Sequence, residues 1–93
     1  MNKFYYVYIL KSLKDKKHYA GYTQSLDLRF EQHQNGKVKS TKHRRPLMLI
    51  YFEGCLNKKD ALKREKYFKT HAGKKYLITR LANWKKNDSP NLI

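Results

Sequence analysis

The chain has 93 residues, of which 22 are lysine or arginine and 7 are aspartate or glutamate, so its formal net charge is +15. A chain of this length buries one core, and we expect a single domain over residues 1–84 with a flexible tail over residues 85–93. Charge of this size attracts polyanions, above all nucleic acid, because each neutralised phosphate releases counterions. An anionic membrane surface is the competing interpretation, but we find no lipidation signal, no basic amphipathic helix and no run of about 18 apolar residues, so we expect no membrane partner.

The numbers and spacing of cysteine, histidine and glycine limit the kinds of site that the chain can form. Cys55 is the only cysteine, which excludes an intramolecular disulfide and favours the reducing cytoplasm. The four histidines are scattered without CxxC or HExxH spacing, so a structural zinc site is not expected. The four glycines form neither a GxGxxG motif nor a P-loop, which argues against a nucleotide-cofactor enzyme.

The first two predicted elements form a hairpin. Phe4–Leu10 and His18–Tyr22 are rich in aromatic and β-branched residues and are separated by a polar turn, which predicts paired antiparallel strands. Alternation along the first strand places Tyr6 and Tyr8 on one face, which Tyr19 of the second strand can share. Both phenols could pack in the core, or they could orient water and exchange protons if neighbouring cations lowered their ordinary pKa of about 10.

A helix is predicted next, over Ser25–Gln34. Leu26, Arg29, Phe30 and His33 recur at helical spacing, so one stripe mixes two apolar side chains with two basic ones. If the apolar pair packs on the sheet, Arg29 and His33 lie at the edge of the buried face. There they could grip a phosphate or move a proton, or they could simply be solvated.

The segment that follows is a basic loop closed by Pro46. Cations alternate with hydroxyl groups, a pattern that can track a phosphate backbone, although a solvated loop has the same composition. The candidate nucleic-acid-binding residues are Lys37, Lys39, Ser40, Thr41, Lys42, His43, Arg44 and Arg45.

One strand and two helices complete the predicted order. The nearly continuous apolar run Leu47–Glu53 predicts a strand that is central in the sheet and buried on both faces. Helical patterning with Asn57 as N-cap predicts a helix over residues 57–72 that ends at Gly73. A last helix is predicted over residues 75–84.

Glu65 interrupts an otherwise apolar stripe of the long helix, formed by Ala61, Phe68 and Ala72. A desolvated carboxylate is costly unless it is paired or bound to a metal. A single carboxylate with waters and substrate oxygens is a common way to hold Mg²⁺. A salt bridge to Lys69, four residues on, is the alternative.

In order and spacing, these residues resemble the GIY-YIG nuclease superfamily, and specifically small stand-alone bacterial proteins of the UPF0213 type. The segment "YVY" at 6–8 stands for the GIY element and "YAG" at 19–21 for YIG, with ten residues between Tyr8 and Tyr19. Arg29 and His33 in "LDLRFEQH" match the arginine and histidine of the family's first helix. Glu65 in "ALKREKYFK" matches its metal-binding glutamate, and "GKVKSTKHRRPLMLIYFE" is similar to the subgroup's basic loop and third strand.

The resemblance implies an α+β fold, with a three-stranded antiparallel sheet flanked by about three helices, and phosphodiester hydrolysis with one divalent cation, Mg²⁺ or Mn²⁺. By position, Glu65 would hold the metal, and Tyr8 and Tyr19 would position or deprotonate the attacking water. Arg29 would stabilise charge on the phosphorus, and His33 would assist proton transfer. The general base, tyrosine or histidine, differs between family members.

The chain departs from the family pattern at three positions. Tyr6 replaces the glycine of GIY and Ala20 the isoleucine of YIG, while Asn83 is the one nearby candidate for an asparagine that many family nucleases carry. The resemblance predicts a monomeric endonuclease acting on DNA, with structure-selective action in repair or processing. The alternatives are a nucleic-acid-binding module with little or no catalysis and a subunit targeted by a protein partner.

Overall fold

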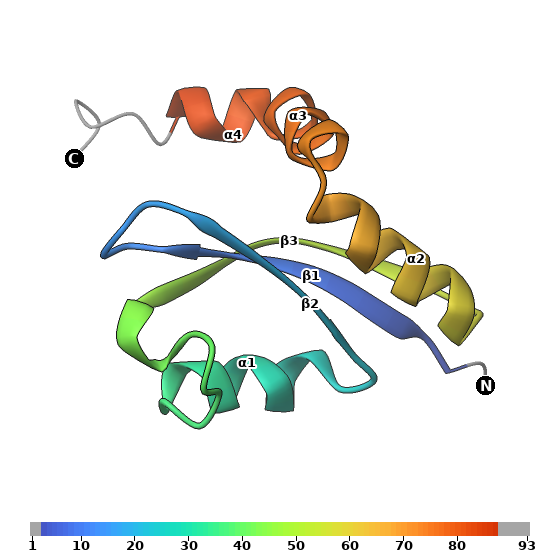
Figure 1. The fold of residues 1–93 in the computed structure, drawn as a ribbon, viewed down its shortest axis with the longest axis horizontal. Coiled ribbons are helices and arrows are strands. Elements are labelled where there is room, and N and C mark those ends of the chain that lie inside the picture. Colours follow the sequence, from blue (N-terminus) through green and yellow to red (C-terminus); the bar gives the residue numbers. More distant parts are fainter. Residues whose placement is uncertain (1–2, 88–93) are drawn as a thin grey trace.

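A computed structural model describes residues 3–87 of the chain (Figure 1). It confirms the α+β fold with a three-stranded antiparallel sheet, flanked by four α-helices and a short 3-10 helix instead of about three helices. In chain order the elements are β1 (Tyr5–Ser12), β2 (His18–Thr23), α1 (Leu26–Gln34), the 3-10 helix η1 (Lys42–Arg44), β3 (Leu47–Cys55), α2 (Lys58–Phe68), α3 (His71–Arg80) and α4 (Ala82–Asn87).

The strand order is β2-β1-β3, so β1 is the central strand. The prediction that the third strand is central was wrong: β3 pairs with β1 alone and leaves Phe52 51% exposed. The residues from Val7 to Leu10 are instead at most 1% exposed, because β1 has a neighbour on each side and a helix over each face. An apolar run indicates burial, but it does not say which of two such runs lies in the middle.

Helices α2 and α3 cover one face of the sheet. Val7, Ile9 and Ala20 point to that face and pack against Phe68 of α2 and Leu77 of α3. Each large side chain that is fully buried there contributes about 1.5–3 kcal/mol. This cluster fixes the position of α2 against the hairpin.

Helix α1 covers the opposite face, as Figure 1 shows. Tyr8, Leu10 and Leu47 form the buried part of this second cluster, and Leu26 and Phe30 of α1 pack against it. The two apolar residues of the mixed stripe therefore attach α1 to the sheet, and they carry the basic residues of the same stripe with them.

Ser12, at the end of β1, ties the hairpin turn to the basic loop. Its hydroxyl accepts hydrogen bonds from the backbone N–H groups of Lys14 and Asp15, both at 3.1 Å, and donates to the carbonyl of Arg44. The side chain of Arg44 also forms an ion pair with Asp15 of the hairpin turn, at 2.9 Å. The loop that contains η1 is thereby held against the hairpin.

Helix α2 ends at Phe68, so the helix expected over residues 57–72 is shorter than the sequence predicted. Thr70 begins a new helix, because its hydroxyl accepts a hydrogen bond from the N–H of Gly73 at 3.1 Å. Gly73 does not end a helix; it lies in the first turn of α3, where any side chain would collide with the carbonyl of Tyr67. Ala72 is exposed and does not extend the stripe of Glu65.

The last helix, expected over residues 75–84, is replaced by α3 and α4, which meet at Leu81. The tail predicted for residues 85–93 overlaps α4 at residues 85–87, and its remaining part, 88–93, lies outside the described residues. Within residues 3–87, no helix is both long and apolar enough to cross a membrane.

Candidate active site around strand β2

Tyr8 and Tyr19 lie on the same face of the hairpin and are offset by two residues along the paired strands. Tyr8 is opposite Gly21 and Leu10 is opposite Tyr19, and the two phenol rings are 6.4 Å apart between centroids. Gly21 is essential to this arrangement, since a side chain there would collide with the phenol of Tyr8. The ring of Tyr8 therefore lies across β2, toward the open edge of the sheet.

His33 is fully buried under these two rings. Its Nε2 is 2.7 Å from the hydroxyl of Tyr8, and its Nδ1 is 2.7 Å from the hydroxyl of Thr41. Its imidazole stands edge-on to both phenols, at 5.6 Å from the ring centroid of Tyr8 and 5.3 Å from that of Tyr19. The histidine thus joins the hairpin, α1 and the basic loop.

Burial and the nearby guanidinium of Arg29 together lower the pKa of His33 to about 4. The imidazole is consequently neutral at pH 7. Burial raises the pKa of Tyr8; a hydrogen bond from Arg29 opposes this rise, while Tyr19 and Glu65 add to it. Tyr8 is therefore a protonated phenol at neutral pH.

Arg29 lies one turn before His33 on α1 and is half-buried. One guanidinium nitrogen donates to the Oε1 of Gln32 at 3.1 Å. Its charge lowers the pKa of His33 and opposes the rise in the pKa of Tyr8. The remaining N–H groups of this guanidinium can serve a phosphate oxygen.

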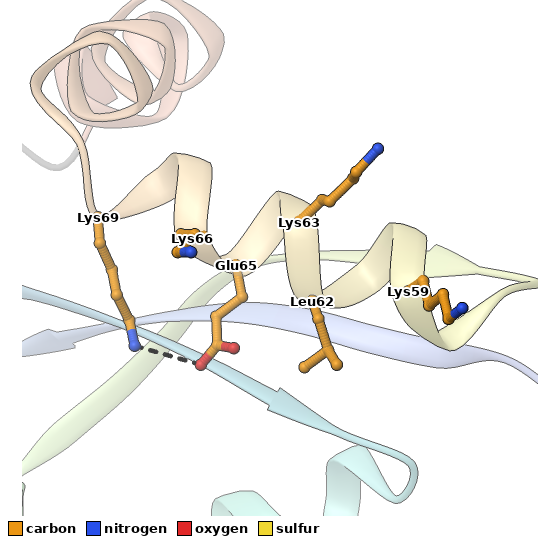
Figure 2. A pocket seen from close by; sticks show the side chains of 6 residues that line it. All are labelled: Lys59, Leu62, Lys63, Glu65, Lys66 and Lys69. Carbon is orange, nitrogen blue, oxygen red and sulfur yellow. Dashed lines mark ion pairs between the residues drawn. The ribbon is translucent and has the colours of Figure 1, made fainter.

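Glu65 reaches the site from α2, on the other side of the sheet. Its side chain is 21% exposed and points toward the sheet in Figure 2, together with Lys69. Lys69 Nζ is 3.4 Å from its Oε2, the salt bridge that the sequence offered as the alternative to a metal. The charge of Glu65 adds to the raised pKa of Tyr8, as the weakest of the causes that shift it.

The surroundings of Glu65 are strongly basic. The open pocket that contains this carboxylate is lined otherwise by lysines and one leucine, all from α2 and its C-cap (Figure 2). This surface was not predicted from the sequence, although lysines recur along the helix at i, i+4 and i+7. The lining residues are Lys59, Leu62, Lys63, Glu65, Lys66 and Lys69.

A metal at this site would have one protein carboxylate. Among residues 3–87, no three His, Cys, Asp or Glu side chains cluster where they could hold an ion together. Glu65 nevertheless suits Mg²⁺, which keeps several waters and takes one or two carboxylates with substrate phosphates. The partly exposed carboxylate in an open pocket leaves room for both kinds of ligand.

The basic loop is divided by burial. Thr41 is fully buried against His33, so its hydroxyl does not lie on the surface where we expected it to meet a phosphate. Arg44 is half-buried and paired with Asp15. The exposed members of the predicted set are Lys37, Lys39, Ser40, Lys42, His43 and Arg45.

The three positions that depart from the family pattern lie apart from these polar groups. Tyr6 is half-buried and packs edge-on against Phe52, with 6.0 Å between ring centroids. Ala20 is buried in the cluster beneath α2 and α3. Asn83 is exposed on α4. The first two are packing positions.

Comparisons with known proteins agree with these motifs. A family model described as the GIY-YIG catalytic domain matches residues 4–77. A UPF0213 protein of Clostridium perfringens is 48% identical over 65 residues, 69% of each chain. The UPF0213 protein YazA of Bacillus subtilis is 44% identical over 75 residues, 80% of this chain and 73% of that one. No solved structure matches the chain.

Proposed function

Because the chain belongs to the GIY-YIG family and is of the UPF0213 type, we propose that it is a small metal-dependent endonuclease that hydrolyses phosphodiester bonds in DNA. The observation that supports this proposal is the contact of Tyr8 with His33 at 2.7 Å, beside the ring of Tyr19 and one helical turn after Arg29. A protein that only bound nucleic acid would need the cations but would gain nothing from a carboxylate facing phosphates.

The proposed division of labour follows from charge and burial. Arg29 donates hydrogen bonds to the phosphate oxygens and stabilises the charge that grows there, which is usually the main source of rate acceleration in such reactions. Tyr8 and Tyr19 orient the attacking water and take part in its deprotonation. Glu65 would hold Mg²⁺ or Mn²⁺, an ion that supplies Lewis-acid activation of the phosphate. Neutral His33 holds the phenol of Tyr8 in place.

We propose two surfaces for the nucleic acid. The exposed cations of the loop at residues 37–45 form one, and the lysines that line the pocket of Glu65 form the other. Both would contact phosphates and not bases, which suits recognition of branched or damaged DNA by shape. The proposal further includes a single catalytic domain, action as a monomer and a cytoplasmic location.

The alternative is a binding module with little or no catalysis, acting alone or targeted by a protein partner. One observation favours it: Glu65 already has a partner in Lys69. In that case the ion pair is structural, and the net charge of +15 serves affinity alone.

Supercoiled, single-stranded and branched DNA, each incubated with and without Mg²⁺ or Mn²⁺, would test the proposal. We expect metal-dependent cleavage that falls by about 10²-fold or more in Glu65→Gln. Glu31→Gln, which removes an exposed carboxylate from α1, is the matched control and should cleave like the wild type. If Glu65→Gln cuts as fast as the wild type, the metal assignment is wrong. Tight, salt-dependent binding without cleavage by any variant would establish the binding module.

Arg29→Ala provides a second test of the site. We expect this substitution to lower kcat more than it weakens DNA binding, because its charge acts on the transition state. Removal of the exposed loop cations Lys42 and Arg45 should do the reverse. An Arg29→Ala variant that bound DNA poorly and kept its kcat would reassign Arg29 to binding.

A further inference from the structure

Three aromatic rings lie together on the part of the sheet that α1 leaves open. Among residues 3–87, Phe4 and Phe52 are the only exposed phenylalanine, tyrosine or tryptophan side chains, at 45% and 51%. Both contact the half-buried ring of Tyr6, whose centroid is 6.3 Å from that of Phe4 and 6.0 Å from that of Phe52. The start of β1 and the end of β3 extend beyond α1 in Figure 1. The rings therefore form an uncovered aromatic surface, which we call the ring platform.

The pairing of β1 with β3 places the ring platform on the same face as the candidate active site. Phe52 is opposite Tyr8, and Gly54 is opposite Tyr6. Gly54 leaves room for the rings, because a Cβ atom there would lie 3.1 Å from the ring of Phe4 and 3.6 Å from that of Tyr6. Tyr6, which replaces the glycine of GIY, is thus the central ring of the platform.

A polar pocket with two cations adjoins the platform. The partner of Tyr6 on β2 is Thr23, and Thr23 lines an open pocket of about 440 Å³. Arg29 of α1 and Lys58 of α2 line the same pocket, and its remaining lining residues are uncharged. Exposed rings beside a basic pocket are the combination that binds single-stranded nucleic acid, because the rings stack bases and the cations neutralise phosphates.

Charge decides which partner the platform fits. A second copy of this chain would bring another net charge of +15 against the first, and the two copies would repel each other. A nucleic-acid strand is attracted by the same charge. Paired bases in a duplex are stacked on one another and do not offer their flat faces, whereas unpaired bases do. The partner that matches both the rings and the charge is therefore an unpaired strand.

We propose that the ring platform stacks the bases of unpaired nucleotides in single-stranded DNA, while Arg29 and Lys58 contact the phosphates of the same segment. The inference deepens the proposed function and rests on it for the identity of the substrate, which becomes DNA with unpaired segments. Stacking tolerates every sequence, since each base has a flat aromatic face. The platform therefore selects for the absence of pairing and not for the identity of the base.

Two oligonucleotides with the same number of phosphates test the platform directly. One is a short oligothymidine, and the other has the same backbone with abasic sites in place of the bases. Fluorescence anisotropy in EDTA measures the affinity of the full chain for each without cleavage. We expect the oligothymidine to bind about tenfold more tightly, because only its bases can stack. Equal affinities for the two strands would overturn the proposal.

Substitutions separate the rings from the cations. The double variant Phe4→Leu/Phe52→Leu keeps two exposed apolar side chains but removes their rings, so it should lose the preference for bases and keep the salt dependence of binding. Lys58→Gln should keep the preference and reduce the slope of log K against log salt by about 0.7. Ile78→Ala, at a position that is 57% exposed on α3, is the control and should change neither quantity.

Two results with these variants would contradict the assignment. A double variant that still prefers bases tenfold would show that the rings are not the stacking site. An unchanged salt slope in Lys58→Gln would remove the pocket from the proposed path of the strand. Circular dichroism of each variant reports whether it is folded.

Sedimentation velocity tests the other occupant, a second copy of the chain. We expect the wild type and the double variant to sediment alike, as monomers. A wild-type dimer that the double variant dissociates would show that the platform is an interface between copies, and would overturn the proposal. If the preference for bases is confirmed and no DNA is cleaved, the proposed function fails and the platform stands. If DNA is cleaved and no preference is found, the platform fails alone.

Discussion

His33 is a fully buried histidine with a pKa of about 4, well below its ordinary value of 6.5. The groups that face it are Arg29 from its own helix, Tyr8 and Tyr19 from the sheet, and Thr41 from the loop. None of these is an acid at neutral pH. The imidazole must therefore take up a proton in acid without a counter-charge beside it, and stability must depend on pH.

We expect the free energy of unfolding to fall as the pH drops from 6.5 to 4, because the unfolded chain binds a proton at His33 that the folded chain does not. The contribution is fully present above pH 6.5, and about 3 kcal/mol of it is removed by pH 4. Urea unfolding of the wild type and His33→Gln across this range measures it. We expect His33→Gln to be less stable than the wild type at every pH in this range, but its free energy of unfolding should change less with pH.

His18→Gln is the control, since burial and Lys85 also lower the pKa of His18. His33→Gln and His18→Gln should each remove a separate part of the slope. Wild-type and His33→Gln curves that run parallel between pH 7 and pH 4 would mean that the folded protein accommodates the charged imidazole.

Sequence reasoning reached Tyr8, Tyr19 and His33 because they lie on elements whose periodicity is plain. Thr41, the hydrogen-bond partner of His33 Nδ1, could not be predicted in the same way. Thr41 sits in a loop without periodicity, and its position depends on the bond from Ser12 to the carbonyl of Arg44. A tertiary contact of this kind leaves no local pattern, so the hydroxyl was assigned to phosphate contact on composition alone.

At the scale of elements, the contact that fixes α2 to β3 is a bidentate ion pair. Arg64 donates to both carboxylate oxygens of Glu53, at 2.8 and 3.0 Å. Its guanidinium also lies 4.7–4.9 Å from the ring centroids of Tyr67, Phe68 and Tyr76. A planar guanidinium can make the two hydrogen bonds to the carboxylate and the ring contacts at the same time, whereas an ammonium group cannot.

Arg64→Lys should therefore destabilise the protein by about 1–2 kcal/mol although the charge is kept. Denaturant unfolding measures the destabilisation, and Lys63→Arg, which changes the same pair of residue types at an exposed neighbouring position, should leave stability nearly unchanged. A double-mutant cycle with Glu53→Gln separates the ion pair from the ring contacts. Equal stability of Arg64→Lys and wild type would mean that α2 is held by its apolar face alone.

The central position of the third strand and the end of the long helix were predicted wrongly for the same reason. Local sequence does not determine which other elements a strand or helix will pack against. The apolar run of β3 resembled that of β1, but only β1 has a strand on both sides. The helical pattern continued past Phe68, but the cap at Thr70 and the close approach at Gly73 turned the chain into α3. Glycine is a helix stop in most contexts and a packing position in this one.

For the whole molecule, a charge of +15 means that strong binding to DNA would not by itself locate a binding surface. The lysines on α2 allow a sharper test. Replacing Lys59, Lys63 and Lys66 by alanine removes three charges from the pocket of Glu65. Replacing Lys75, Lys85 and Lys86 removes three from α3 and α4, where each is also exposed and helical.

We expect the first triple variant to bind duplex DNA more weakly and with a shallower salt dependence, the slope of log K against log salt falling by about 0.9 for each phosphate that the protein no longer neutralises. The second should change the slope much less. Fluorescence anisotropy titrations in EDTA at several salt concentrations measure both without cleavage. Equal slopes for the two triples would show that α2 is no more a binding surface than any other basic face.

The crowding of lysines around Glu65 has one more consequence, for the order in which the complex assembles. A divalent cation that approaches the carboxylate enters a pocket lined by four lysines and competes with the ion pair to Lys69. A nucleic-acid strand laid over the same lysines would cancel their repulsion of the ion. Metal and DNA should then bind cooperatively, each raising the affinity of the other by the same factor.

This factor can be measured by calorimetry, with Mn²⁺ titrated into the free protein and into its complex with a non-cleavable oligonucleotide. The same titration of the Glu65→Gln complex measures the Mn²⁺ that binds to the DNA alone, and this contribution is subtracted. We expect weak binding to the free protein and clearly tighter binding in the complex; equal affinities would contradict the cooperativity. A nuclease built in this way would circulate without its metal and acquire it only on a substrate, so the charge that attracts DNA would also keep the free enzyme inactive.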